Sequence, residues 1–84
     1  MLSMFKDSDQ EKANSNLNEY DLNMMQGATA MLQGNFKLAA QHHRNIANAL
    51  DNLQTLKNEK ESLVAAADLY QQIQRQEALR GQKI

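Results

Sequence analysis

Hydrophobic residues recur at helical spacing from Leu17 onward. Asn16 and Glu19 have the spacing of a capping box, which predicts the start of a first helix at Asn16. The apolar stripe of this helix consists of Leu17, Tyr20, Met24, Ala28 and Met31. Gly27 lies inside the stripe, and since glycine weakens a helix we expect it to mark close contact with a neighbouring helix. Gly34 is expected to end the helix as a left-handed cap.

A second stripe follows after a very short link. Asn35 can serve as the N-cap, and the apolar face then consists of Phe36, Ala39, His43, Ile46, Leu50 and Leu53. Helices joined by so short a link pack as antiparallel neighbours, so the sequence predicts an αα-hairpin.

The hydrophobic phase then changes. Leu56, Leu63, Tyr70 and Ile73 cluster roughly opposite the preceding stripe, and the polar stretch between residues 54 and 62 separates the two. Asn58 and Glu61 again have capping-box spacing. We therefore predict an all-α fold in which the chain turns near Asn58 and a third helix completes a three-helix bundle. The alternative is a hairpin with one long helix in an oligomeric coiled coil. Residues 1–15 are expected to be a flexible N-terminal tail and residues 16–81 the helical domain.

Composition narrows the functional classes. The 84 residues include no cysteine and no proline, and the net charge is −1 with both signs interspersed. We therefore expect neither disulfides nor a thiolate metal site, and no nucleic-acid partner. No run approaches the length of a transmembrane segment. Together these features favour a cytoplasmic location.

The adjacent histidines His42 and His43 are the most conspicuous candidate for chemistry. Helical metal ligands need a spacing of three or four residues to reach one ion, and adjacent side chains point about 100° apart. His43 falls on the predicted core stripe, where a structural role is expected, with His42 beside it. We find no nucleophile motif and no phosphate-binding loop. The sequence predicts no enzyme, no cofactor and no metal.

Several apolar residues lie off the predicted core stripes. A contiguous exposed apolar patch marks an interface, and the candidates for partner binding are Met25, Leu32, Leu38, Ala65 and Leu69. The glutamine-rich end of the chain has a face that could pack against another helix.

The segment from Gly27 to Leu50 resembles a tetratricopeptide-type hairpin. Gly27, Gly34, Phe36 and Ala39 match its small, small, aromatic and alanine positions, whereas Asn23 stands where the motif is apolar. A single hairpin followed by a third helix is more similar to the microtubule-interacting-and-transport (MIT) domain. That resemblance, over roughly residues 17–79, implies grooves that bind a helical peptide.

Two functions follow from these patterns. The first is an adaptor or small chaperone that binds an amphipathic helix of a partner protein in an apolar groove. The second is an assembly subunit, in a homo-oligomer or in a larger complex such as a secretion apparatus or a virion. The partner is a protein in both cases, and it could be another copy of the chain.

Overall fold

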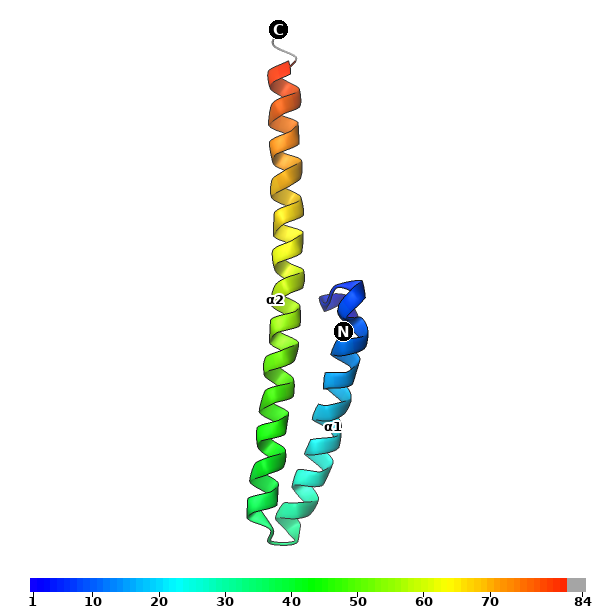
Figure 1. The fold of residues 1–84 in the computed structure, drawn as a ribbon, viewed down its shortest axis with the longest axis vertical. Helices are drawn as coiled ribbons and strands as arrows, with labels where there is room; N and C mark the ends of the chain where they lie inside the picture. Colours follow the sequence, from blue (N-terminus) through cyan, green and yellow to red (C-terminus); the bar gives the residue numbers. More distant parts are fainter. Residues whose placement is uncertain (82–84) are drawn as a thin grey trace.

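Two long helices lie side by side in a hairpin in the computed structural model, which describes residues 1–81 (Figure 1). Two short 3-10 turns, η1 (Leu2–Met4) and η2 (Asp7–Asp9), precede helix α1 (Gln10–Leu32), and helix α2 spans Phe36–Gly81. The molecule is a rod with extents of 77 × 18 × 13 Å. α2 has 46 residues and α1 has 23, so α2 continues far beyond the start of α1.

The turn between the helices is held by its own backbone. Gly34 has a φ of 77°, the left-handed conformation that glycine adopts without strain. The Asn35 amide donates to the Ala30 carbonyl and the Gly34 amide to the Met31 carbonyl, which is the Schellman pattern. The Asn35 side chain then accepts from the Leu38 amide at 3.2 Å and caps α2. The predicted roles of Gly34 and Asn35 are confirmed.

The two helices meet along a seam of alternating three- and four-residue steps, as in an antiparallel coiled coil. In α1 the seam residues are Ala13, Asn16, Tyr20, Asn23, Gly27 and Ala30. In α2 they are Ala39, His42, Ile46, Ala49, Leu53, Leu56 and Lys60. All of these are buried or half-buried, and many have small side chains. Small residues at a seam let two helix backbones approach closely.

Gly27 lies where the backbone of α1 comes close to α2. A Cβ atom added there would lie 3.2 Å from the Cβ of His42 and 3.5 Å from the ring of His43. Since 3.2 Å is tighter than ordinary van der Waals contact, any larger residue would push the helices apart. The expectation that Gly27 marks close contact with a neighbouring helix is confirmed.

The predicted core faces are right only in part: Tyr20, Ala39, Ile46 and Leu53 lie on the seam, and other predicted positions do not. Met24, Met31, Phe36 and Leu50, which the sequence placed in the core, are 46%, 53%, 69% and 50% exposed. The seam instead uses the adjacent face, where small and polar residues alternate with a few large ones. Close packing selected this face, because bulky methionines and phenylalanine would hold the backbones too far apart.

The predicted three-helix bundle is wrong. α2 runs through Asn58 without a break, and the Asn58 side chain accepts from Gln54 at 2.8 Å within the helix. Lys57 and Glu61 form an ion pair at 2.8 Å, one helical turn apart. The apparent change of phase comes from the misplaced core face. When the seam is followed through Leu56 and Lys60, its repeat continues to Leu63, Ala67 and Tyr70 unchanged.

The N-terminal region is helical earlier than the sequence pattern indicates. α1 begins at Gln10, and Asn16, the predicted N-cap, lies within it. The Asn16 side chain donates to the Lys12 carbonyl at 2.9 Å and accepts from Asn52 of α2 at 3.1 Å. Phe5 is buried, at 4% exposure. Residues 1–15 therefore hold several structured contacts against the helices.

Neither helix of the described chain has a stretch both long enough and apolar enough to cross a membrane.

We predict that enlarging a seam residue destabilises the hairpin. Ala30 is 2% exposed, and the antiparallel register sets it opposite the buried Ala39. Ala30→Leu should lower the free energy of unfolding by about 1–3 kcal/mol through overpacking. Ala28→Leu makes the same change on the exposed face of the same helical turn and should leave stability nearly unaltered. Thermal and urea unfolding followed by circular dichroism measure both, and equal effects would contradict the assigned seam.

Candidate protein-binding surface

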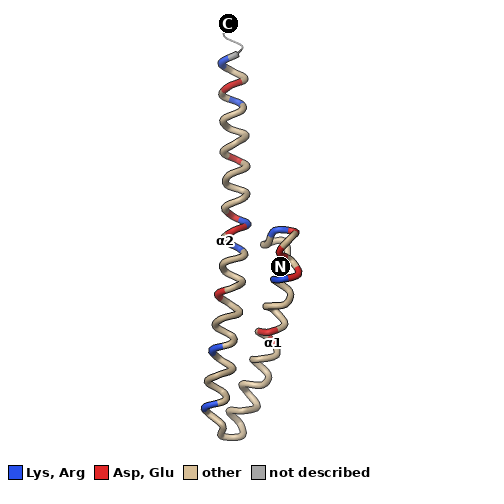
Figure 2. Tube along the Cα trace, in the orientation of Figure 1, with Lys and Arg blue, Asp and Glu red and all other residues tan. Residues whose placement is uncertain are grey.

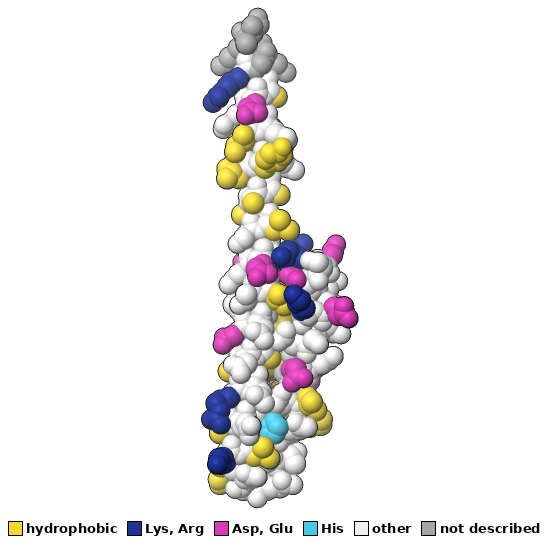
Figure 3. Space-filling model, in the orientation of Figure 1, with side chains coloured by type: hydrophobic (Ala, Val, Ile, Leu, Met, Phe, Trp, Pro, Cys, Tyr) yellow, Lys and Arg dark blue, Asp and Glu magenta, His cyan; other side chains and the backbone are white. Residues whose placement is uncertain are grey.

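The part of α2 beyond the start of α1 is not covered by α1, although Met4 of the N-terminal turns lies beside its base. Every one of the 20 residues from Glu61 to Arg80, here called the projecting segment, is exposed. Its large apolar residues, with their exposed fractions, are Leu63 55%, Val64 48%, Leu69 58%, Tyr70 61%, Ile73 45% and Leu79 60%. Figure 3 shows hydrophobic side chains gathered along this segment, above the level of the N-terminal turns.

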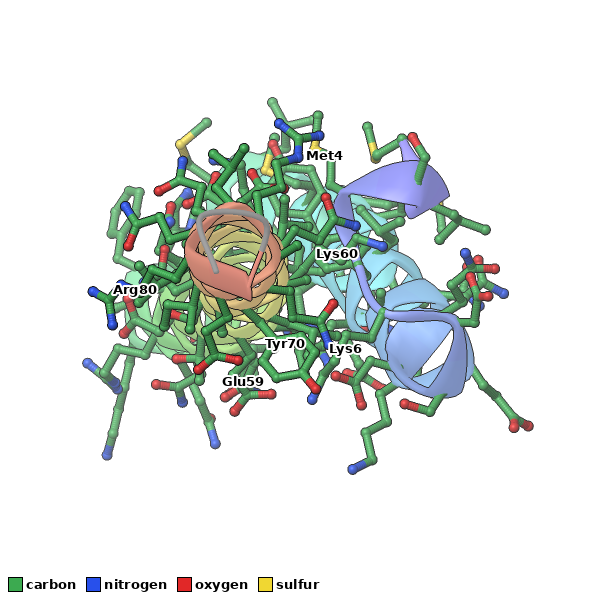
Figure 4. The ribbon with its side chains drawn as sticks, turned by 90° about the horizontal axis from the view of Figure 1, so that it is seen from above. Met4, Lys6, Glu59, Lys60, Tyr70 and Arg80 are labelled. Atoms are coloured by element: carbon green, nitrogen blue, oxygen red, sulfur yellow. The ribbon has the colours of Figure 1, made fainter. Side chains whose placement is uncertain are left out.

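The apolar residues of the projecting segment include the continuation of the seam. Leu63, Ala67 and Tyr70 occupy the next seam positions after Lys60, with Ala66 and Ile73 beside them. Viewed along α2, Lys60 and Tyr70 point toward the side on which α1 lies (Figure 4). An isolated helix of about this length is marginal in water even with a favourable sequence. The segment therefore presents a coiled-coil face whose partner helix is not supplied by α1.

The predicted partner-binding residues do not form one groove. Met25 and Leu38 line the same open hollow near the hairpin turn, together with His42. Leu32 is 86% exposed at the end of α1. Ala65 and Leu69 lie on the projecting segment, roughly 40 Å along α2 from Leu38 at about 1.5 Å per residue. The five residues thus belong to two separate surfaces.

A second apolar hollow flanks the hairpin where the N-terminal segment folds back. It is lined by Met1, Met4, Phe5, Leu17, Tyr20, Leu50, Leu53, Gln54 and Lys57. Phe5 closes its floor, while Met1 and Met4 remain 75% and 48% exposed. This hollow lies at the same end of the hairpin as the root of the projecting segment, because Met4 also contacts the space lined by Lys60 and Val64.

A polar network crosses the seam at Asn23, which is only 4% exposed. Its side-chain oxygen accepts from His42 Nδ1 at 2.8 Å and from the Asn45 amide at 3.2 Å. Its amide nitrogen donates to the Glu19 carbonyl oxygen at 2.7 Å and to the Glu19 carboxylate at 3.3 Å. Because a buried amide is stable only when its hydrogen bonds are made, this network favours one register of the two helices.

The two histidines have different environments. His42 is half-buried and is the histidine on the seam, whereas His43, which the sequence placed there, is exposed. His43 Nδ1 donates to the Ala39 carbonyl at 2.8 Å, within its own helix. Residues 1–81 contain no group of three His, Asp or Glu side chains placed to hold a metal ion. Both imidazoles are engaged in helix packing and hydrogen bonding.

The sequence pattern identified the important apolar residues of the projecting segment but assigned them to a closed core. Leu63, Tyr70 and Ile73 were expected to face the other helices of a bundle, and they are exposed instead. Asn23 was seen only as a departure from an apolar motif. Its register three residues after Tyr20 and four before Gly27 is the signal that could have placed it on the seam.

Acidic and basic side chains are distributed along α2, whereas in α1 they lie only between Glu11 and Asp21 (Figure 2). Comparison with protein-family models, curated proteins and solved structures gave no match. The resemblance to tetratricopeptide and MIT domains therefore stays a prediction.

We predict that Asn23 stabilises the hairpin through this network. Asn23→Ala removes the acceptor used by His42 and Asn45 and should cost about 1–3 kcal/mol of unfolding free energy. Asn18→Ala makes the same change at an exposed position of α1 and controls for helix propensity. Urea unfolding measures the difference, and equal stabilities of the two variants would show that the network contributes nothing.

Proposed function

We propose that the protein is a non-enzymatic interaction subunit that binds a helix of another protein chain along the projecting segment of α2. The observation that supports this proposal is the exposed continuation of the hairpin seam. Leu63, Ala67 and Tyr70 repeat the spacing by which α2 already packs against α1, in a part of α2 that α1 does not reach. A helix added there would extend an interface of the same kind. The proposal retains the cytoplasmic location expected from the sequence.

Burial of the exposed apolar side chains would provide the driving force. Leu63, Tyr70 and Ile73 each keep about half of their surface in contact with water. Full burial of a large apolar side chain contributes about 1.5–3 kcal/mol. Several such residues on one helix can therefore offset the cost of ordering a partner, which single scattered residues cannot.

The hairpin provides a firm base for this interaction. α2 is continuous from Phe36 to Gly81, so the projecting segment is held in line with the packed half of the same helix. Lys6 forms an ion pair with Glu59 at 3.6 Å and ties the N-terminal turns to α2 just below the segment. A partner helix would meet a segment whose direction is already set, which lowers the entropy cost of binding.

The proposal predicts face-specific photocrosslinking in the cells that produce the protein naturally. Tyr70→p-benzoylphenylalanine places a photoreactive group on the seam face, and Gln72→p-benzoylphenylalanine places it on the opposite face of the same turn. We expect a protein adduct at position 70 and little or none at position 72, since a partner helix would cover only the seam face. Denaturing gels and mass spectrometry detect the adduct and its mass.

The specificity of that adduct is checked by a second substitution. Leu63→Asp should abolish it, because a charge would be buried in the new interface. Gln72→Asp, which adds the same charge on the outer face, should leave it intact. Circular dichroism verifies that both variants keep the hairpin. Equal adducts at both positions, or none at position 70, would refute the proposed function.

A further inference from the structure

We infer that the partner helix is the projecting segment of a second copy of this chain, bound in the antiparallel direction. This inference rests on the proposed function and specifies its occupant. The pair would be a closed dimer about a two-fold axis near the middle of the segment. Each copy would then use the same patch, as the interface of a symmetric dimer requires.

Side-chain sizes in the segment fit this arrangement. Within the hairpin the antiparallel register sets the large Tyr20 against the small Ala49. In an antiparallel pair of projecting segments, the large Tyr70 of each copy would lie against Ala67 of the other. Ile73 would lie likewise against Ala66. The projecting segment thus contains both the large and the small residues of this packing. In the hairpin the large residue comes from α1 and the small one from α2.

Charges at the seam favour the antiparallel direction. Glu59 and Lys60 lie at the base of the segment, beside the seam and on it, and Glu77 and Arg80 lie near its tip, on the seam and beside it. Antiparallel pairing brings the base of one copy to the tip of the other, so that Lys60 approaches Glu77 and Glu59 approaches Arg80. Parallel pairing in register would set each charge against its own kind, which is destabilising.

Arg80 lies beside the seam, three heptads after Glu59. In Figure 4 Arg80 points away from α1, whereas Lys60 points toward it. A straight helix turns a seven-residue repeat by about 20° per heptad, so Arg80 is turned by roughly 60° from the direction of Glu59, three heptads before it. Left-handed supercoiling in a helix pair removes this drift and returns the tip to the interface.

The length of the segment suits such a pair. Twenty exposed residues extend about 30 Å at about 1.5 Å per residue. The tip of each copy would reach the level of the partner's N-terminal turns, where Leu2 and Met4 are 37% and 48% exposed. Pairing would place the two hairpins at opposite ends of one long rod.

Spin labels test the direction of helix pairing. Because the chain has no cysteine, an introduced cysteine is the only thiol to which a label can attach. Ser62→Cys labels the base of the segment and Gln76→Cys labels its tip, both on the outer surface. In an antiparallel dimer, the mixed sample of base-labelled and tip-labelled chains gives the short distance. Each variant alone gives a distance longer by about 20 Å along the axis. A parallel dimer reverses this pattern and would overturn the inference.

Exchange of the two charges provides an independent test on the full chain. Glu77→Lys should weaken the dimer by roughly tenfold, since the symmetric interface uses the changed contact twice. Lys60→Glu combined with Glu77→Lys should restore it. Light scattering and sedimentation over a wide concentration range measure the dissociation constants. Failure of the double variant to recover would contradict the Lys60–Glu77 contact and with it the antiparallel register.

The experiments distinguish failure of the dimer from failure of the proposed function. A wild-type chain that stays monomeric at every concentration overturns the second copy as occupant. The photoadduct at position 70 then decides the function: an adduct with a different protein keeps it, and absence of any adduct removes it. An adduct of twice the chain mass, together with the short mixed-label distance, supports both.

Discussion

The close approach of α1 and α2 at Gly27 governs how the rest of the chain is arranged. A backbone-to-backbone contact this tight, with the Cβ of His42 only 3.2 Å from where a Cβ of residue 27 would lie, is possible only if the seam is built from small side chains. Ala13, Ala30 and Ala49 meet that requirement and are almost fully buried. The larger residues are consequently left outside. The hairpin gains a narrow seam and leaves many large apolar side chains exposed.

Because the helices differ in length, part of this exposed apolar surface lies along a single segment of α2. α1 covers only the first half of α2, yet the repeat that defines the seam continues past Lys60 to Tyr70. Packing against α1 does not require this repeat beyond the part of α2 that α1 covers. The exposed apolar residues around the hairpin, such as Met24 and Phe36, lack a comparable continuation. This difference favours the projecting segment over the flanks of the hairpin as the proposed binding site for another helix.

Local signals in the sequence were sufficient for the hairpin turn and for the helical class. Gly34, Asn35 and Gly27 act through their own backbone conformation, capping ability or size, and each has the predicted role. The seam itself could not be identified from hydrophobicity, because the face with the largest apolar residues was not the face that packs. Choosing His43 and Leu50 in place of His42 and Ala49 created an artificial phase break, and that break produced the incorrect third helix. Helix–helix distance, a tertiary quantity, decides between two faces whose hydrophobic periodicity is equally good.

The polar network at Asn23 connects packing to specificity. Five of the thirteen seam residues are alanine or glycine, and such small side chains do little to oppose sliding of one helix along the other. Hydrogen bonds from His42 and Asn45 to one buried oxygen remove that freedom, since a shifted register would leave them unmade. The fixed register also sets which residue of α2 lies level with the start of α1, and therefore where the projecting segment begins. The charges at Lys60 and Glu77 can select a direction of pairing only because that starting point is constant.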